Sequence, residues 1–301
     1  MSGNPDLELR AGDTRAVLAP EVGATIVRYW SEGKAGPLHW LRPGPLGGGT
    51  PRRPGEMGCY PLVPYSNRIR NGKFRFGGRE IALPLNFGDH PHSIHGQGWQ
   101  SSWSAVSHTE SEAALEYRHA PDAWPWEYRA RMNFRLAPQR LSVTLSLENL
   151  STSPMPAGLG FHPYYPRTPL TSLTADVEQV WLTDQEVMPV RREAPPPEWD
   201  LRKGLRVESA VMDNGFTGWK RKAVVDWPEE KRRLTLTGGD GLEFLVVYTP
   251  KGRANFCAEP VSHCTDAFNR AEAGERDTGM RVLAPGEGWT VEIGLQAEMT
   301  G

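Results

Sequence analysis

This sequence has few cysteines, no long apolar run and almost no net charge. Its 301 residues include only Cys59, Cys257 and Cys264, which form no CxxC pair and leave one thiol unpaired under any disulfide scheme. A reducing cytoplasm is therefore the expected location. The longest apolar stretches, such as 244–248 (FLVVY), fall far short of the ~20 residues that a membrane helix requires. The N-terminus also lacks the basic and apolar layout of a secretory signal, so we expect no membrane partner.

The sequence also lacks the patterns that bind nucleotides or form covalent intermediates. A formal net charge of -2 gives no reason to expect nucleic acid as a partner. The glycines of the Gly/Pro-rich stretch 42–56 do not lie between a strand and a helix, so this stretch is expected to be a loop and not a phosphate-binding fingerprint. No GxSxG elbow or Walker loop occurs, and no cysteine has the setting of a thiolate nucleophile. We therefore expect a cofactor-free protein.

Period-two alternation of apolar and polar residues recurs along the chain and predicts an all-β fold. It is clearest at 127–137 and 140–150, around a Pro-Gln turn, and at 288–299. The pattern also runs through 232–250, with a turn at 238–241. Shorter strand signals cover 7–12, 14–20 and 23–30, and 73–83 is expected to form a hairpin that turns at two glycines. No amphipathic helix is longer than about two turns by apolar spacing. Residues 1–301 are expected to form one large β-sandwich domain.

Four segments crowd polar and aromatic residues beside glycine or proline, as loops that present a site do. They are 61–74 (PLVPYSNRIRNGKF), 86–99 (NFGDHPHSIHGQGW), 158–166 (GLGFHPYYP) and 255–269 (NFCAEPVSHCTDAFN). The spacing of His90, His92 and His95 invites a zinc interpretation, but no cysteine or acidic pair nearby completes a ligand set. We therefore expect no metal and interpret these histidines as loop residues that donate hydrogen bonds.

His162 and Glu259 are the candidate acid–base pair. His162 lies among aromatic residues, where a histidine is either a satisfied core residue or an imidazole that titrates in a partly desolvated pocket. Glu259 lies in an apolar run, where a carboxylate is costly unless it is paired or used. Burial raises the pKa of a carboxyl and makes it a better proton acceptor. A structural ion pair with an arginine, or a helix N-cap, explains Glu259 equally well.

Taken together, these segments resemble the aldose 1-epimerase (galactose mutarotase-like) family. The resemblance extends from about residue 10 to residue 297. Its motifs are Ser66-Asn67-Arg68-Ile69 with Gly72-Lys73-Phe74, Ile94-His95-Gly96, Gly160-Phe161-His162-Pro163-Tyr164, Asp213-Asn214-Gly215-Phe216, and Glu259-Pro260-Val261 with Asp266-Ala267-Phe268-Asn269. Their shared order makes the set specific. Unlike better-known members, the chain continues from His162 as Pro-Tyr-Tyr-Pro and from His95-Gly96 as Gln-Gly-Trp.

The resemblance implies a galactose mutarotase-like supersandwich of large antiparallel sheets. It implies Glu259 as general base and His162 as general acid in a cofactor-free, metal-free interconversion of the α and β anomers of an aldose. The residues that it implies for sugar binding are His95, Arg68, Asn67 and Asp213. The partner is then a small sugar, and the protein a cytoplasmic monomer or homodimer.

Two alternatives use the same fold. The first is an epimerase of hexose 6-phosphates, for which Arg52, Arg53, Arg68 and Arg70 could supply phosphate contacts. The second is a carbohydrate-binding module without catalysis, which needs no acid–base pair. A purely structural sandwich domain is a weaker third alternative, since fold alone does not fix function.

Overall fold

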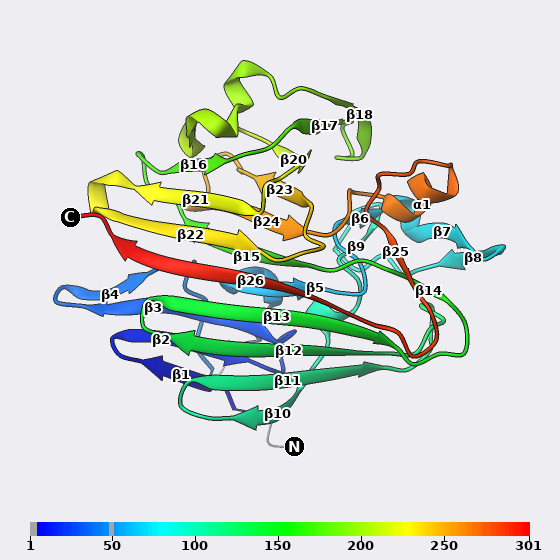
Figure 1. Cartoon of the computed structure of the whole chain (residues 1–301), viewed down its shortest axis with the longest axis horizontal. Coiled ribbons are helices and arrows are strands. Elements are labelled where there is room, and N and C mark those ends of the chain that lie inside the picture. Colours follow the sequence, from blue (N-terminus) through cyan, green and yellow to red (C-terminus); the bar gives the residue numbers. More distant parts are fainter. Residues whose placement is uncertain (1–4, 48–50) are drawn as a thin grey trace.

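The computed structural model describes residues 5–47 and 51–301, and its regular structure is mainly antiparallel β-strand (Figure 1). In this part of the chain, one sheet has eleven strands and another has nine. The larger sheet contains, in spatial order, β1 (Leu7–Ala11), β2 (Thr14–Ala19), β3 (Thr25–Gly33), β5 (Cys59–Leu62), β15 (Gly160–Pro166), β24 (Asn255–Val261), β23 (Phe244–Tyr248), β20 (Asp213–Thr217), β17 (Gln179–Thr183) and β18 (Pro189–Glu193), with β4 (Gly36–His39) paired to β3.

The smaller sheet lies against the larger one and is formed mostly by the middle and the end of the chain. It contains, in spatial order, β10 (Ser104–His108), β11 (Glu112–His119), β12 (Tyr128–Ala137), β13 (Arg140–Asn149), β26 (Gly288–Met299), β22 (Arg232–Gly238), β21 (Lys222–Trp227), β16 (Ser172–Ala175) and β19 (Leu205–Arg206). The predicted all-β class with large antiparallel sheets is therefore confirmed.

Small elements complete the fold outside the two sheets. Three strand pairs are β6 (Arg68–Ile69) with β9 (Ser93–Ile94), β7 (Lys73–Phe76) with β8 (Arg79–Ala82), and β14 (Met155–Ala157) with β25 (Arg281–Leu283). The α-helix α1 (Ala267–Glu272) and the short 3₁₀ helices Pro54–Glu56, Arg70–Gly72, Gly98–Gln100, Pro197–Trp199, Leu201–Lys203, Val207–Ser209 and Pro228–Glu230 lie in the connections. Within the described ranges, no helix is long and apolar enough to cross a bilayer.

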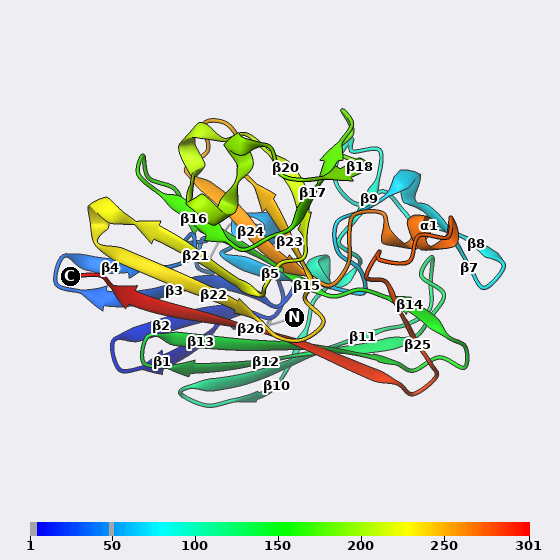
Figure 2. The same cartoon turned by 45° about the horizontal axis from the view of Figure 1, so that its top comes forward.

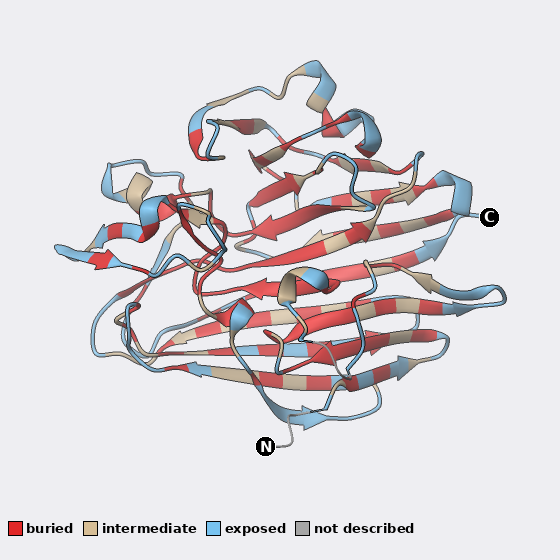
Figure 3. Ribbon diagram, turned by 180° about the vertical axis from the view of Figure 1, so that it is seen from behind, coloured by how far each residue is buried: buried red, intermediate tan, exposed pale blue. Residues whose placement is uncertain are grey.

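The predicted strands form because their apolar residues alternate with the pleat. On β12, Met132, Phe134 and Leu136 are buried while the residues between them face outward, and β13 repeats this pattern. These inward side chains join those of the larger sheet in one hydrophobic core. Figure 2 shows the strands of the two sheets as adjacent layers, and Figure 3 shows buried residues along the strands of both. A direct bond also links the layers, because the hydroxyl of Tyr29 on β3 donates to the carbonyl of Leu295 on β26 at 3.2 Å.

The predicted turn at 238–241 and the predicted loop at 42–56 differ in how the structure describes them. The strands predicted within 232–250 form as β22 and β23, but β22 pairs with β21 and β26 whereas β23 pairs with β20 and β24. The turn at 238–241 therefore carries the chain from one sheet to the other and does not close a hairpin. Residues 48–50 of the loop predicted over 42–56 lie outside the described residues, and its described parts contain no strand.

The central strands β15 and β24, like their neighbours β5 and β23, do not alternate between buried and exposed residues. They are buried at nearly every position, on both faces. A strand with one face on the core normally exposes its other face to solvent. The second face of these two strands is covered by the loops around β6 and β9, which lie over it on the side away from the core.

Candidate active site

A cavity of about 800 Å³ lies over the second face of the larger sheet. Its lining residues are Arg53, Pro54, Gly55, Glu56, Tyr60, Asn67, Arg68, Asn86, Phe87, Gly88, Ile94, His95, Trp99, Gln100, His162, Tyr164, Asp213, Tyr248 and Glu259. The strands supply the floor, and the loops near 53–56, 67–68 and 86–100 supply the walls. The cavity has the volume and the mixture of aromatic and polar groups that are typical of small-molecule sites.

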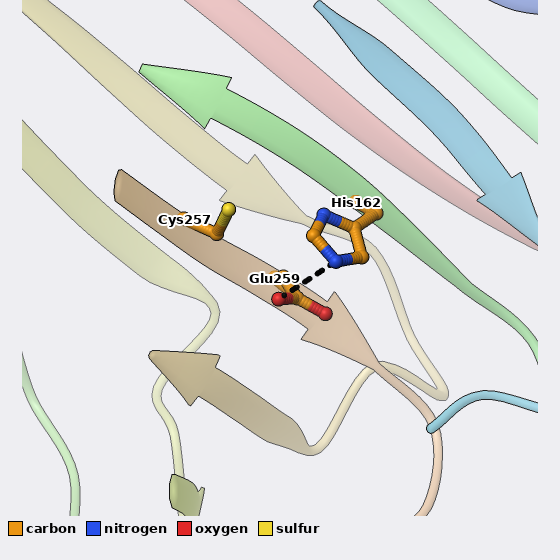
Figure 4. Close-up of side chains that lie close together, drawn as sticks. All are labelled: His162, Cys257 and Glu259. Atoms are coloured by element: carbon orange, nitrogen blue, oxygen red, sulfur yellow. Dashed lines mark ion pairs between the residues drawn. The ribbon is translucent and has the colours of Figure 1, made fainter. Parts of the chain in front are cut away.

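Strand register places His162 and Glu259 side by side on the floor. β15 and β24 are antiparallel, with Tyr164 opposite Cys257 and Gly160 opposite Val261. His162 therefore lies opposite Glu259, and both point to the same face because directly opposite residues of an antiparallel pair project from the same side of the sheet. Figure 4 shows the imidazole and the carboxylate facing each other from the two adjacent strands.

The pair is buried and in contact. Nε2 of His162 lies 3.2 Å from Oε1 of Glu259, and their side chains are only 8% and 4% exposed. Burial raises the pKa of Glu259 well above its ordinary value, and the nearby Asp213 adds to this rise. Burial, together with the guanidinium of Arg42, lowers the pKa of His162 to about 3. Each group therefore favours its neutral form, with the carboxyl of Glu259 protonated and the imidazole of His162 uncharged. The facing atoms, Oε1 of Glu259 and Nε2 of His162, share one proton that either can accept.

The other ring nitrogen of His162, Nδ1, places no constraint on the tautomer. Nδ1 is buried and has no hydrogen-bond partner among the described residues. A partner on Nδ1 normally fixes the tautomer of a histidine. In its absence, the contact of Nε2 with Glu259 is the side-chain interaction that sets the tautomer of His162.

Cys257 is the third polar group beside the pair (Figure 4). One donor atom each of His162, Cys257 and Glu259 lie within 4.8 Å of one another, so these residues could together hold a metal ion. Burial and the charge of Glu259 raise the pKa of the Cys257 thiol well above its ordinary value. Zinc binding would require the thiolate form of Cys257.

Asn67 and His95 are held together at the wall of the cavity. The backbone N–H of Asn67 donates to Nδ1 of His95 at 3.0 Å. Both residues have left-handed backbone conformations, with φ of 55° and 64°, which asparagine and histidine adopt more readily than most residues. Because Nδ1 of His95 accepts this bond, its other nitrogen, Nε2, carries the proton and is a potential donor to a ligand. Burial, with His162 and Arg68 nearby, lowers the pKa of His95 well below its ordinary value, so the ring is neutral.

Arg68 and Asp213 form an ion pair that lines the cavity. The guanidinium of Arg68 donates to Asp213 at 3.1 Å, to Oδ1 of Asn67 at 3.0 Å and to Nε2 of His90 at 3.2 Å. The side chains of Arg68 and Asp213 are 11% and 25% exposed, so the pair still reaches the cavity. Its charges are balanced, and its remaining donors and acceptors suit uncharged hydroxyl groups.

An aromatic wall flanks His162. The ring of Tyr164 stacks on the imidazole with centroids 4.7 Å apart, and the ring of Tyr60 lies 4.5 Å from it. Trp99 stacks on Tyr60 at 5.2 Å, and the guanidinium of Arg42 covers Tyr164 at 3.7 Å. These rings fix the plane of the imidazole and provide apolar surface of the kind on which the C–H face of a sugar can lie.

The cavity contains every site residue that the sequence predicts. Glu259, His162, His95, Arg68, Asn67 and Asp213 all line it. Glu259 contacts His162 from the middle of β24 and is therefore not a helix N-cap. Sequence reasoning did not assign Tyr60, Tyr164, Cys257 and Trp99 to the site. Tyr164 and Trp99 lie in the two motifs that depart from the family pattern. That departure is the sequence feature that could have indicated their place in the site.

The histidines at 90, 92 and 95 accept hydrogen bonds from neighbouring N–H groups, whereas the sequence-based prediction is that they donate. Nδ1 of His92 accepts from the backbone N–H of Asn71 at 3.2 Å, and His90 and His95 accept from Arg68 and Asn67. These three rings belong to no group of convergent metal-binding side chains in the described residues. They organise the wall of the cavity.

Comparison with known proteins places the chain in a family. The family model described as aldose 1-epimerase matches residues 5–296. The chain therefore belongs to the aldose 1-epimerase family. The uncharacterised protein YphB of Escherichia coli strain K12 is 34% identical over 284 residues, which are 92% of this chain and 93% of that protein. The uncharacterised protein YihR of the same strain is 30% identical over 281 residues, 87% and 85% of the two chains.

Solved structures share the fold. A crystal structure from Escherichia coli K12 has a TM-score of 0.88 at 29% identity and covers 98% of this chain and 99% of its own. A galactose mutarotase-like protein from Clostridium acetobutylicum has a TM-score of 0.84 at 22% identity, covering 97% and 94%. The predicted galactose mutarotase-like fold is therefore confirmed.

Proposed function

We propose that this protein is an aldose 1-epimerase that interconverts the α and β anomers of an unphosphorylated aldose. The observation that carries the proposal is the buried contact between His162 and Glu259 on the floor of a cavity that is large enough for a sugar. Family membership supports the same reaction class. The residue roles below are part of the proposal.

In the proposed mechanism, Glu259 removes the proton of the C1 hydroxyl while His162 protonates the ring oxygen. The C1–ring oxygen bond breaks, and the open chain carries an aldehyde at C1. Rotation about the C1–C2 bond presents the other face of the aldehyde, and the reverse proton transfers close the ring. Each positioned acid or base typically contributes ~10²–10⁴-fold to the rate. The aromatic wall and the compact cavity also hold the open chain near its closing geometry.

The reactive form needs the single proton of the pair on His162. In the resting site both groups favour the neutral state, which leaves this proton on Glu259. The 3.2 Å contact lets the proton move from the carboxyl to Nε2, which produces a carboxylate base and an imidazolium acid without any exchange with solvent. One proton thus circulates within the pair and the substrate, and no net proton is consumed.

The four remaining predicted residues are proposed to bind the hydroxyl groups of the sugar. Arg68 and His95 supply donors, Asp213 supplies an acceptor, and Asn67 orients Arg68 through its side-chain oxygen. A small number of placed polar groups in a largely aromatic cavity fixes the orientation of a ligand. Here that orientation must bring C1 and the ring oxygen to Glu259 and His162.

Ion pairing favours a free sugar over a sugar phosphate. Arg52 is bound by both carboxylate oxygens of Asp6, at 2.7 and 2.8 Å, and does not line the cavity. Arg70 also lies outside the cavity lining and pairs with Asp184 and Glu186. Arg68 pairs with Asp213. Of the four arginines considered for phosphate binding, Arg53 alone forms no side-chain ion pair within the described residues; its backbone N–H donates to Oε2 of Glu56 at 3.3 Å, and both residues line the cavity.

The test is anomer exchange in a panel of free aldoses and their 6-phosphates. Wild type is expected to accelerate interconversion of at least one free aldose above the spontaneous rate, measured by polarimetry and by NMR exchange. Glu259→Gln should abolish the acceleration, and Arg70→Met is the matched control that should retain it. A wild type without acceleration on every sugar would overturn the proposal. Sugar binding without turnover, unchanged in Glu259→Gln, would indicate a carbohydrate-binding module.

A cytoplasmic location remains part of the proposal. Cys59, Cys257 and Cys264 are all buried and free of disulfides. Three free thiols suit a reducing compartment.

A further inference from the structure

His263 is a buried titratable residue that the proposed chemistry does not use. It follows β24, four residues after Glu259, and is only 2% exposed. It does not line the cavity, so it cannot touch a sugar there. A buried histidine without a ligand or a charged partner calls for a physical explanation, because desolvating an imidazole is costly.

The hydrogen bonds of His263 fix its tautomer. Nδ1 lies 2.7 Å from the carbonyl oxygen of Cys264, which can only accept, so Nδ1 carries the proton. Nε2 is then an acceptor, and the backbone N–H of Ser66 donates to it at 3.0 Å. Burial lowers the pKa of His263 to about 4, in agreement with a neutral ring. The ring therefore connects the chain segment after Glu259 to the segment that begins the motif Ser66-Asn67-Arg68.

Three consecutive amides of that motif are bound by side chains. The N–H of Ser66 donates to His263, that of Asn67 to His95, and that of Arg68 to Oδ1 of Asn67 at 2.9 Å. These bonds hold the left-handed turn at Asn67, from which both polar side chains reach the cavity. A shift of the Ser66 amide would therefore move Asn67 and Arg68 directly.

The other side of the His263 ring packs against the segment that leads to His162. A Cβ atom added to Gly158 would lie 1.9 Å from Cδ2 of His263, so the ring rests on a glycine that no larger residue could replace without moving the ring. Gly158 in turn donates its N–H to the carbonyl of Pro64 at 2.7 Å. His263 thus contacts three segments, which carry Glu259, His162 and Arg68.

From these contacts we propose that His263 is a positioning residue, whose neutral imidazole sets Asn67 and Arg68 at the correct distance from the acid–base pair. This inference rests on the proposed function. It predicts a specific kinetic effect: loss of the bond to Ser66 weakens sugar binding and leaves the His162–Glu259 contact in place. A merely structural role would instead lower the fraction of active protein, with KM unchanged.

Two nearly matched substitutions separate these roles. In His263→Asn the amide lies near the position of Nδ1 and can keep the bond to Cys264, but it cannot reach Ser66. In His263→Gln the amide oxygen can reach the position of Nε2 and keep the bond to Ser66, but the bond to Cys264 is lost. Each variant therefore loses the hydrogen bonds of one ring nitrogen, and only the first loses those to Ser66, which come from its backbone N–H and its hydroxyl. Thermal unfolding confirms that each is folded.

We expect His263→Asn to raise KM for the best free aldose by on the order of tenfold, with kcat within about twofold of wild type. His263→Gln should keep KM near the wild-type value. Equal KM values in the two variants, or a loss confined to kcat, would overturn the inference. If His263→Asn does not fold, Gly158→Ala replaces it, because the added methyl displaces the ring, and the same rise in KM is expected.

The control for the proposed function is the wild type itself. A wild type that does not accelerate anomer exchange overturns the proposed function and not the positioning role. In that event, the Kd of the same aldoses, measured by calorimetry for His263→Asn and His263→Gln, decides the positioning role by the same comparison.

Discussion

Replacing Arg68 with methionine tests how the cavity binds its sugar. Methionine keeps most of the length and apolar surface of the side chain and removes the guanidinium that donates to Asp213, Asn67 and His90. A hydrogen bond to a charged group contributes about 1.5–3 kcal/mol. Loss of one such contact to a sugar hydroxyl therefore raises KM roughly 10- to 150-fold. The change in kcat should be smaller, since the contact between His162 and Glu259 remains.

Arg70→Met is the matched control for this substitution. Arg70 is two residues away, its side chain is 43% exposed, and its carboxylate partners lie 3.5 and 3.6 Å from it, outside the cavity lining. Exposed pairs of this kind contribute about 0–1 kcal/mol. We expect its KM to stay within about twofold of wild type. Initial rates by coupled or polarimetric assay over a range of sugar concentrations give both constants. Equal KM values for the two variants would refute the assignment of Arg68 to sugar binding.

Three further predictions concern the acid–base pair. Glu259→Gln and His162→Asn should each lower kcat by about 10²–10⁴-fold, and the double variant should lose no more than the larger single loss, because the two groups act as a unit; losses that multiply would contradict a shared mechanism. The pKa of Glu259 is raised in the folded state, so the stability that its neutral form contributes is present at low pH and is lost as pH rises through that raised value. Urea unfolding should therefore show Glu259→Gln gaining stability relative to wild type toward alkaline pH, and a constant difference would contradict the raised pKa. Tyr164→Ala removes the ring stacked on His162 and should lower kcat about 2- to 10-fold, whereas Tyr164→Phe, which keeps the ring, should not; equal rates in the two variants would rule out a role for stacking.

Strand formation was largely predictable from the sequence, because alternation is a local property. The stretch 127–150 carries its own turn and its own pairing partner, and it forms β12 and β13, which pair across the predicted Pro-Gln turn. The turn at 238–241 shows the limit of this reasoning. Its glycines permit a tight hairpin or a crossing between sheets, and the choice depends on which distant strands pair with β22 and β23. Pairing of that kind is not encoded in the segment itself.

The predicted site residues came from motifs, whereas their arrangement depends on strand register. His162 and Glu259 lie opposite each other because β15 and β24 are neighbours with Tyr164 facing Cys257. Once Tyr164 is known to face Cys257, the antiparallel register places His162 opposite Glu259. Tyr60 enters the site in the same way, as the residue on β5 that lies opposite His162. It has no local motif, so only the fold reveals it.

A crystal structure of the Glu259→Gln variant with its aldose bound would test the central claim most directly. The pair should flank the reacting atoms, with the C1 hydroxyl within hydrogen-bond distance of the side chain at position 259 and the ring oxygen within the same reach of Nε2 of His162. Arg68 and Asp213 should contact hydroxyl groups farther from C1. A sugar bound with C1 and its ring oxygen directed away from both residues would contradict the account.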